Sequence, residues 1–135
     1  MPTVRFPGRY SSLDAICEFV RETARAAGLG EQQVYEVDLA TNEGASNIID
    51  HAYGGEGEGV VECTCEIGPD GLTIILRDWG EPFDPAAVDE PDFNVPLEEL
   101  SLRGAGLRII RNCMDEVNYS PNAKGGNQLR MRKNT

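Results

Sequence analysis

A glutamate and an asparagine four positions apart, Glu43 and Asn47, are the first residues in the chain whose types and spacing could do chemistry. In a helix, this spacing places both side chains on one face. The carboxylate could then take or orient a proton, and the amide oxygen could ligate a hard cation such as Mg²⁺. The same two residue types also make up ordinary solvated helix faces, so the pair alone leaves both interpretations open.

A second candidate site begins where an apolar run ends, in the segment 78–85 (DWGEPFDP). The Asp78 carboxylate, followed by Gly80, is well placed at the end of a strand to accept a hydrogen bond from a ligand. The alternative is an ordinary turn in which this side chain bonds to nearby backbone. The aromatic residues Trp79 and Phe83 are expected in the core or in a pocket wall rather than in a partner contact.

The segment 103–107 (RGAGL) supplies a third candidate, an anion site. Gly104 and Gly106 would open a helix, where backbone N–H groups and the helix dipole attract a phosphate, and Arg103 adds positive charge. A lone Gly-x-Gly is common, and this one lacks the third glycine and the preceding strand of the dinucleotide-binding fingerprint. The segment alone therefore indicates no particular ligand.

Apolar periodicity and turn residues predict the elements that would position these segments. The patterns predict helices over 13–27, 31–52 and 104–114, and strands over 3–6, 60–67, 72–78, 116–120 and 128–132. The acidic, proline-rich stretch 80–103 is typical of a long functional loop. No internal repeat or linker interrupts the 135 residues, so we expect one domain over 1–135.

The charge of the chain is unevenly distributed. The formal net charge is −11, made up of −16 over residues 1–102 and +5 over residues 103–135. An acidic protein is a poor whole-surface ligand for nucleic acid or for an anionic membrane, so we expect neither as a direct partner. The basic C-terminal third is compatible with a local anion site.

Other composition features narrow the function classes. No apolar run approaches the roughly 18 residues of a membrane span, and no signal peptide is evident, so a cytoplasmic location is expected. The four cysteines fit no zinc spacing and are expected as small core residues. His51 is the only histidine, which leaves no basis for a Ser-His-Asp triad or a histidine metal site, and we expect it to cap or pack a helix end.

Taken in order, a helical Glu-x-x-x-Asn, a strand-end Asp-x-Gly and a helix-opening Gly-x-Gly-Leu resemble the N, G1 and G2 boxes of the GHKL (Bergerat-fold, HATPase_c type) ATPase superfamily. The details are most similar to the bacterial anti-sigma factor serine/threonine kinases. The closer similarity lies in the segments 47–53 (NIIDHAY), 78–85 (DWGEPFDP), 106–117 (GLRIIRNCMDEV) and 125–129 (GGNQL). The resemblance covers nearly the whole chain.

The resemblance implies a role for each of the main candidates. Glu43 would be the catalytic carboxylate that activates the attacking hydroxyl, and Asn47 would bind the Mg²⁺ that bridges the phosphates. Asp78 would accept a hydrogen bond from the adenine N6 amino group, and Gly80 would allow the base to approach closely. A carboxylate at this position would face the O6 lone pairs of guanine, so the site should prefer ATP to GTP.

The remaining nucleotide contacts also follow from the resemblance, with residues 86–103 as the ATP lid. They are Phe83, Arg103, Gly104, Ala105, Gly106, Leu107 and Asn127. The sequence departs from the family pattern at Pro82, where many members have a second glycine, and at Asn42, which is more often small or apolar. The lid is acidic and has no glycine between Gly80 and Gly104, which bears on the turnover rate rather than on nucleotide binding.

The function implied by this family is that of an ATP-dependent serine/threonine protein kinase acting as an anti-sigma regulatory factor. It would use ATP and Mg²⁺ to phosphorylate a small, STAS-like anti-sigma factor antagonist, sequester a sigma factor, or do both, as a homodimer. The alternative is an ATP-binding interaction module without significant kinase activity. The catalytic half of a split histidine kinase is disfavoured, because no phosphoacceptor or dimerisation helix pair is present.

The family also implies the fold. We expect an α/β chain forming an α+β two-layer sandwich, in which three helices cover one face of a Bergerat-type mixed, mostly antiparallel sheet of four or five strands. The nucleotide would lie between the helices and the lid.

Overall fold

Five strands form one sheet in the computed structural model, which describes residues 2–57, 59–83, 106–121 and 125–135. In spatial order they are β1 (Thr3–Pro7), β2 (Val60–Gly68), β3 (Gly71–Asp78), β5 (Asn127–Asn134) and β4 (Glu116–Ser120). All four neighbouring pairs are antiparallel, where the sequence led us to expect a mixed, mostly antiparallel sheet. The expected lid, 86–103, lies outside the described residues.

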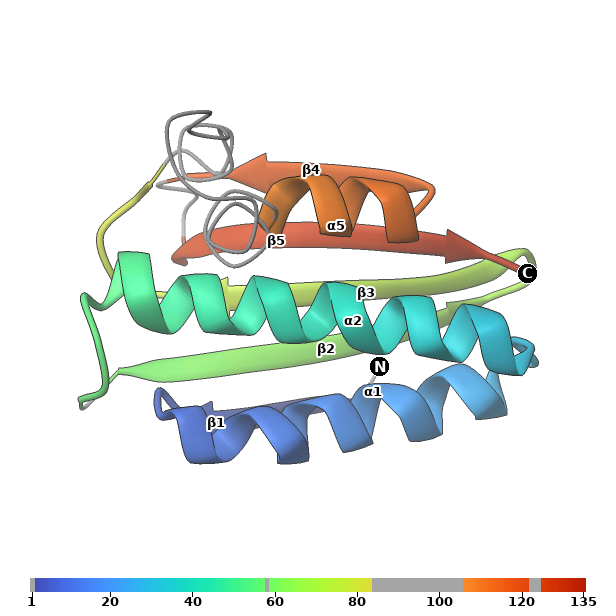
Figure 1. Cartoon of the computed structure of the whole chain (residues 1–135), viewed down its shortest axis with the longest axis horizontal. Coiled ribbons are helices and arrows are strands. Elements are labelled where there is room, and N and C mark those ends of the chain that lie inside the picture. Colours follow the sequence, from blue (N-terminus) through green and yellow to red (C-terminus); the bar gives the residue numbers. More distant parts are fainter. Residues whose placement is uncertain (1, 58, 84–105, 122–124) are drawn as a thin grey trace, which may run out of the picture.

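Three α-helices cover one face of this sheet in the described chain, as expected for a two-layer sandwich (Figure 1). They are α1 (Leu13–Ala26), α2 (Glu31–Asn47) and α5 (Gly106–Cys113), and a 3₁₀ turn η1 (Tyr10–Ser12) precedes the first. The central helix α2 packs against both of the others. None of the described helices is both long enough and apolar enough to cross a membrane.

The helix expected over 31–52 changes its geometry before it ends. The α-helix stops at Asn47, and a π-helical turn, η2 (Ile48–Ala52), completes the segment. The Tyr53 N–H donates to the Ile48 carbonyl five residues earlier, at 3.1 Å. This i→i+5 bond is the mark of a π turn, a feature often found at functional sites.

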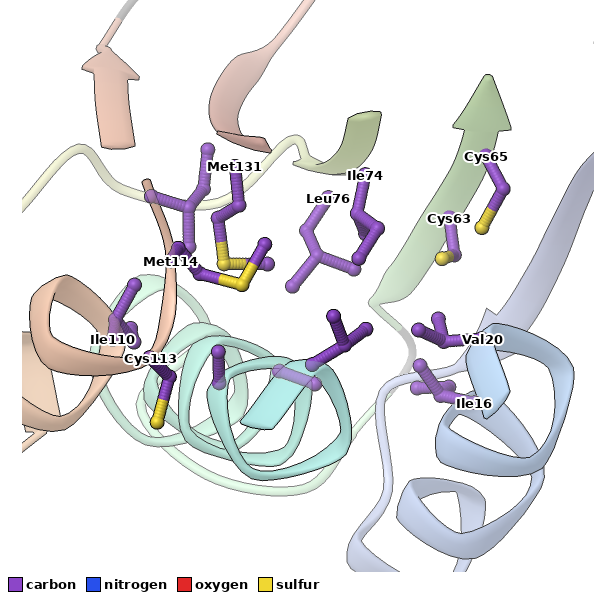
Figure 2. Packing of buried hydrophobic residues seen from close by; sticks show 14 of the residues in the cluster. Ile16, Val20, Cys63, Cys65, Ile74, Leu76, Ile110, Cys113, Met114 and Met131 are labelled. Carbon is purple, nitrogen blue, oxygen red and sulfur yellow. The ribbon is translucent and has the colours of Figure 1, made fainter. Parts of the chain in front are cut away.

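The core fills the space between the helices and the sheet. Ile16 and Val20 of α1 face Cys63 of β2, while Ile110 of α5 packs at the other end near Met131 of β5 (Figure 2). All four cysteines are buried free thiols, as expected of small core residues. Burial raises the pKa of the Cys17 thiol to about 12, so it stays protonated at neutral pH.

Glycine allows α2 to lie close to the sheet. A Cβ added to Gly44 would lie 2.9 Å from Leu76 Cδ1 of β3 and 2.9 Å from Leu129 Cδ2 of β5. These distances are shorter than ordinary carbon–carbon contacts, so any side chain here would force the leucines or the helix to move. The helix that carries Glu43 and Asn47 is therefore held directly over the strands that carry Asp78 and Asn127.

The topology brings the ends of several elements to one edge of the molecule. The C-terminal end of α2, the end of β3, the beginnings of α5 and β5 and the end of β4 lie at the same edge (Figure 1). Since β3 and β5 are antiparallel, the last residue of β3, Asp78, is paired in register with the first residue of β5, Asn127. Residues that are 49 positions apart in sequence thus meet at one point.

Candidate functional site

Asp78 and Asn127 form a buried polar pair at the paired ends of β3 and β5. The two residues are 1% and 3% exposed. Asn127 Nδ2 donates to Asp78 Oδ1 at 2.9 Å and to the Gly80 carbonyl at 3.0 Å. The Gly80 N–H also donates to Asp78 Oδ1, at 2.9 Å. The turn bond expected from the alternative interpretation of this segment is therefore present, but it occupies only one carboxylate oxygen.

The second oxygen of Asp78 is the chemically informative one. Every hydrogen bond described for this side chain ends on Oδ1, so Oδ2 receives none from the described residues. Burial raises the pKa of the Asp78 carboxyl, and the bonds from Asn127 and from the Gly80 N–H oppose that rise. A buried carboxylate with one oxygen still available favours a ligand that donates a hydrogen bond.

A narrow, mostly apolar pocket lies in front of this carboxylate, between α2, α5 and the sheet. Its lining comes from six elements and the segment after β3: Gly44, Asn47, Ile48, Asp78, Phe83, Ile110, Tyr119 and Leu129. The free volume inside is about 10 Å³, room for about one water molecule. A planar heterocycle with an amino group suits such apolar walls and one acceptor, provided that the aromatic side chains move apart to admit it.

Aromatic rings close one side of the pocket. The Phe83 ring lies 5.5 Å from the Tyr119 ring and 5.6 Å from the His51 ring, both tilted at 42°. The Phe83 N–H also donates to the Tyr119 hydroxyl, at a long 3.4 Å. Burial raises the pKa of the Tyr119 hydroxyl, the Phe83 N–H opposes the rise, and the nearby Asp78 carboxylate adds to it.

Tyr119 was not among the residues predicted from the sequence. It lies on β4 two residues after Val117, and the alternation of the strand puts both side chains on the face that the helices cover. That alternation was the available signal, although it does not reveal that this edge strand borders the pocket. His51, expected to cap or pack a helix end, packs against Phe83.

Glu43 and Asn47 lie one turn apart on α2, as their spacing predicts. Both are half-buried, and Asn47, the last residue of the helix, lines the pocket. Glu43 is not among the lining residues and lies one turn back toward the start of α2. The pair therefore leads from the pocket back toward the start of α2.

The Asn47 amide oxygen would suit Mg²⁺ only if phosphate oxygens supplied further ligands. Among the described residues, no cluster of three or more His, Cys, Asp or Glu side chains is present that could hold a metal ion by itself. Mg²⁺ commonly takes one or two protein oxygens and completes its shell with water and substrate phosphates. One amide oxygen at the pocket mouth fits that pattern.

Close backbone packing fixes the segment after Asp78 from two sides. A Cβ on Gly80 would collide with the Ala52 carbonyl and lie 2.9 Å from Tyr53 Cδ1, while a Cβ on Gly126 would lie 2.5 Å from the Asp78 carbonyl. Gly126 also has a φ of +108°, which glycine adopts without strain. Gly80 therefore packs closely against Ala52, the last residue of η2, and against Tyr53, the residue after it.

The phosphate-binding candidates are only partly within the described chain. Gly106 and Leu107 begin α5, at the same edge of the sheet as the pocket, and Ile110 one turn later lines it. Arg103, Gly104 and Ala105 lie outside the described residues.

Comparisons with known proteins identify the family of the chain. Residues 6–133 match the family described as the histidine kinase-like ATPase domain. Among curated proteins, the chain is 28% identical over 102 residues to an anti-sigma F factor of Clostridium novyi, an alignment that covers 76% of this chain and 71% of that protein. It is 32% identical over 98 residues to the serine-protein kinase RsbW of Halalkalibacterium halodurans, covering 70% of this chain and 59% of that one.

A second serine-protein kinase RsbW, from Bacillus cereus, is 33% identical over 100 residues. The chain spans 61% of its length, so these kinases extend well beyond the matched part. Among solved structures, the histidine kinase domain of a blue-light activated histidine kinase from Erythrobacter litoralis superposes with a TM-score of 0.54 at 17% identity, over 91% of this chain and 59% of that one. That likeness supports the fold. The match over residues 6–133 establishes that the chain belongs to the family of histidine kinase-like ATPase domains.

Proposed function

We propose that this chain is an ATP-dependent serine/threonine protein kinase that acts as an anti-sigma regulatory factor. The observation that carries the proposal is the buried Asp78 carboxylate, which is held through one oxygen and lines a mostly apolar pocket that Asn47 also lines. The names of the relatives, an anti-sigma F factor and two serine-protein kinases, support the choice of protein substrate.

In this proposal, the pocket takes the adenine of ATP. Asp78 Oδ2 accepts a hydrogen bond from the N6 amino group, while the apolar walls and the ring of Phe83 or Tyr119 cover the faces of the base. Asn47 would hold Mg²⁺, which would neutralise phosphate charge. The backbone N–H groups of residues 104–107, with Arg103, bind the phosphates at the start of α5.

Glu43 is proposed to act on the phosphoacceptor hydroxyl. Its carboxylate takes the serine or threonine proton as the hydroxyl oxygen bonds to the γ-phosphorus, and the bond from that phosphorus to ADP breaks. Phosphoryl transfer relies mainly on positioning and charge neutralisation, so one base, one metal ion and backbone donors are sufficient.

The partners follow from the same proposal. The substrate is a small, STAS-like anti-sigma factor antagonist, and the unphosphorylated antagonist and a sigma factor compete for a homodimer of this chain in the cytoplasm. The chain acts as one domain over residues 1–135.

The test is phosphotransfer from Mg-ATP to the cognate antagonist, with Glu43→Gln as the variant. We expect phosphoserine or phosphothreonine with the unmodified protein, and a 10²- to 10⁴-fold slower rate for the variant at unchanged ATP affinity. Glu31→Gln, at the exposed start of the same helix, is the matched control and should leave the rate unchanged.

Normal ATP binding with no transfer to the antagonist would contradict the kinase proposal. Equal rates for Glu43→Gln and the unmodified protein would remove Glu43 from the chemistry. If regulation of the sigma factor also survived Glu43→Gln, sequestration rather than phosphorylation would be the function.

A further inference from the structure

The hydroxyl of Tyr53 joins three segments that are remote in sequence. It donates to the Val60 carbonyl at 2.6 Å and accepts from the N–H groups of Val60 at 3.2 Å and Trp79 at 3.0 Å. Tyr53 directly follows η2, Val60 begins β2, and Trp79 is the first residue after β3. A phenol hydroxyl offers one donor and two acceptor positions, so these three bonds use it fully.

The ring of Tyr53 packs against Gly59 and Gly80, which are the neighbours of the two residues that its hydroxyl bonds. A Cβ on Gly59 would lie 2.6 Å from the ring, and one on Gly80 would lie 2.9 Å from it. The preceding residue adds a further link, because the Ala52 carbonyl accepts from the Glu81 N–H at 2.8 Å. Residues 52 and 53 therefore hold residues 79–81 by two hydrogen bonds and one ring contact.

The segment 79–81 in turn sets the position of the Asp78 carboxylate. Oδ1 is bonded to the Gly80 N–H, and Asn127 Nδ2 is shared between Oδ1 and the Gly80 carbonyl. A shift of Gly80 would therefore turn the carboxylate and move Oδ2. Tyr53 makes that shift costly, because its hydroxyl and ring would have to move too.

The other end of this link is the helix that carries the proposed catalytic groups. Helix α2 runs through Glu43 and Asn47 into η2 without a break, and Tyr53 is the next residue. The Asp78 carboxylate and the Glu43–Asn47 helix are therefore tied to each other through Tyr53, although Tyr53 does not line the pocket.

We propose that Tyr53 is a positioning residue for the nucleotide site: its hydroxyl fixes the base-recognising carboxylate of Asp78 relative to the end of the helix that carries Glu43 and Asn47. The inference rests on the proposed function, since it assumes that this pocket binds ATP. It predicts that removing a hydroxyl that touches no nucleotide changes both the affinity and the base selectivity of the site.

The variant Tyr53→Phe tests this, because it keeps the ring and removes all three hydrogen bonds. We expect it to bind ATP roughly tenfold more weakly and ADP weaker by the same factor, with a smaller preference for ATP over inosine triphosphate. Calorimetry well below the unfolding temperature gives these constants. Tyr35→Phe is the matched control, since Tyr35 lies on α2, is 61% exposed and has no hydrogen bond described for its hydroxyl.

A purely structural role would lower the unfolding temperature and leave the affinities and the selectivity of the folded protein unchanged, and that result would overturn the inference. A second measurement needs no variant. Saturating ATP should slow hydrogen exchange at the amides of Trp79 and Val60, which both donate to Tyr53, and unchanged exchange at both would overturn the inference even if Tyr53→Phe failed to fold. Absence of ATP binding by the unmodified protein would instead overturn the proposed function, and this inference with it.

Discussion

The two halves of the candidate site are built in different ways. At the paired strand ends, Asp78 and Asn127 are almost completely buried, bonded to each other and held in register by β3 and β5. At the helix end, Glu43 and Asn47 are half-buried on one helix that finishes in a π turn. The half proposed to recognise the base is fixed by the sheet, whereas the half proposed for metal binding and catalysis depends on how a helix end is held.

The difference indicates that the strand ends and the helix end have separate tasks in the proposed site, base selection and phosphoryl transfer. Selecting a base requires one acceptor at a fixed point, which strand register supplies together with the hydrogen bonds from Asn127 and the Gly80 N–H. Phosphoryl transfer requires a carboxylate and a metal ligand to meet a triphosphate, and in this proposal the end of α2 supplies both from successive turns. Gly44 and Tyr53 connect the two halves, one by close packing and one by hydrogen bonds.

Of the variants considered, Asp78→Asn, in the strand-end half of the site, should weaken nucleotide binding most. The amide oxygen can accept the same two hydrogen bonds as Oδ1, so the fold should persist. Its NH₂ group would replace Oδ2 and face the adenine amino group, donor against donor. We expect ATP affinity to fall roughly 100-fold and inosine triphosphate, which presents an acceptor, to bind relatively better.

Competition binding of the two nucleotides measures this change of preference. Asp70→Asn, in the exposed turn at the opposite end of β3, is the control and should bind both nucleotides as the unmodified protein does. Unchanged ATP binding by Asp78→Asn would mean that the base lies elsewhere.

Tyr119→Ala tests the aromatic pocket wall on β4, which belongs neither to the strand-end half nor to the helix-end half of the site. Losing an aromatic face against a base costs about 1–3 kcal/mol in comparable stacking contacts, so ATP affinity should fall roughly tenfold. Tyr119→Phe should stay within about twofold, because the hydroxyl contact to the Phe83 N–H is long, at 3.4 Å. Fluorescence of Trp79, the one tryptophan in the chain, offers a direct titration signal. Tighter binding by Tyr119→Ala would show that the ring obstructs the pocket instead of covering the base.

Much of this arrangement could be predicted from local patterns. The strand at Glu116–Ser120 was predicted to the residue, and the helix at 13–27 differs from the observed Leu13–Ala26 by one position, because alternation and helical spacing are local properties. The pairing of Asp78 with Asn127 could not be predicted, since register depends on residues 49 positions apart. The π turn was missed for a similar reason: apolar spacing does not reveal whether a carbonyl bonds four or five residues ahead.

Gly44→Ala tests the packing that connects the two halves. The added methyl would meet Leu76 and Leu129 at 2.9 Å, and overpacking a core costs about 1–3 kcal/mol, against about 1 kcal/mol gained in helix propensity. We expect a net loss of about 1 kcal/mol in the free energy of unfolding, together with weaker ATP binding because the methyl narrows the pocket. Ser46→Ala, two residues along the same helix, gains propensity without the clash and should not be destabilised. Urea unfolding of both variants gives the comparison, and a stabilised Gly44→Ala would mean that the leucines repack freely.

The smallest expected effect is the pH dependence of stability that Asp78 contributes. Burial raises the pKa of this carboxyl above its ordinary value of 3.8, so the native protein binds the proton more tightly than the unfolded chain. The stability it contributes is therefore complete below 3.8 and is lost as the pH rises through the raised native value. Asp78→Asn stays neutral throughout, so its free energy of unfolding should increase relative to that of the unmodified protein as the pH rises from about 4 to about 7. Urea unfolding without nucleotide at several pH values measures the difference in free energy of unfolding between the variant and the unmodified protein. The contributions of the other carboxyl groups are the same in both proteins and cancel in this difference. A difference that ran in the opposite direction would mean that the bonds from Asn127 and Gly80 outweigh burial, and that the strand ends stabilise the ionised carboxylate even before a base arrives.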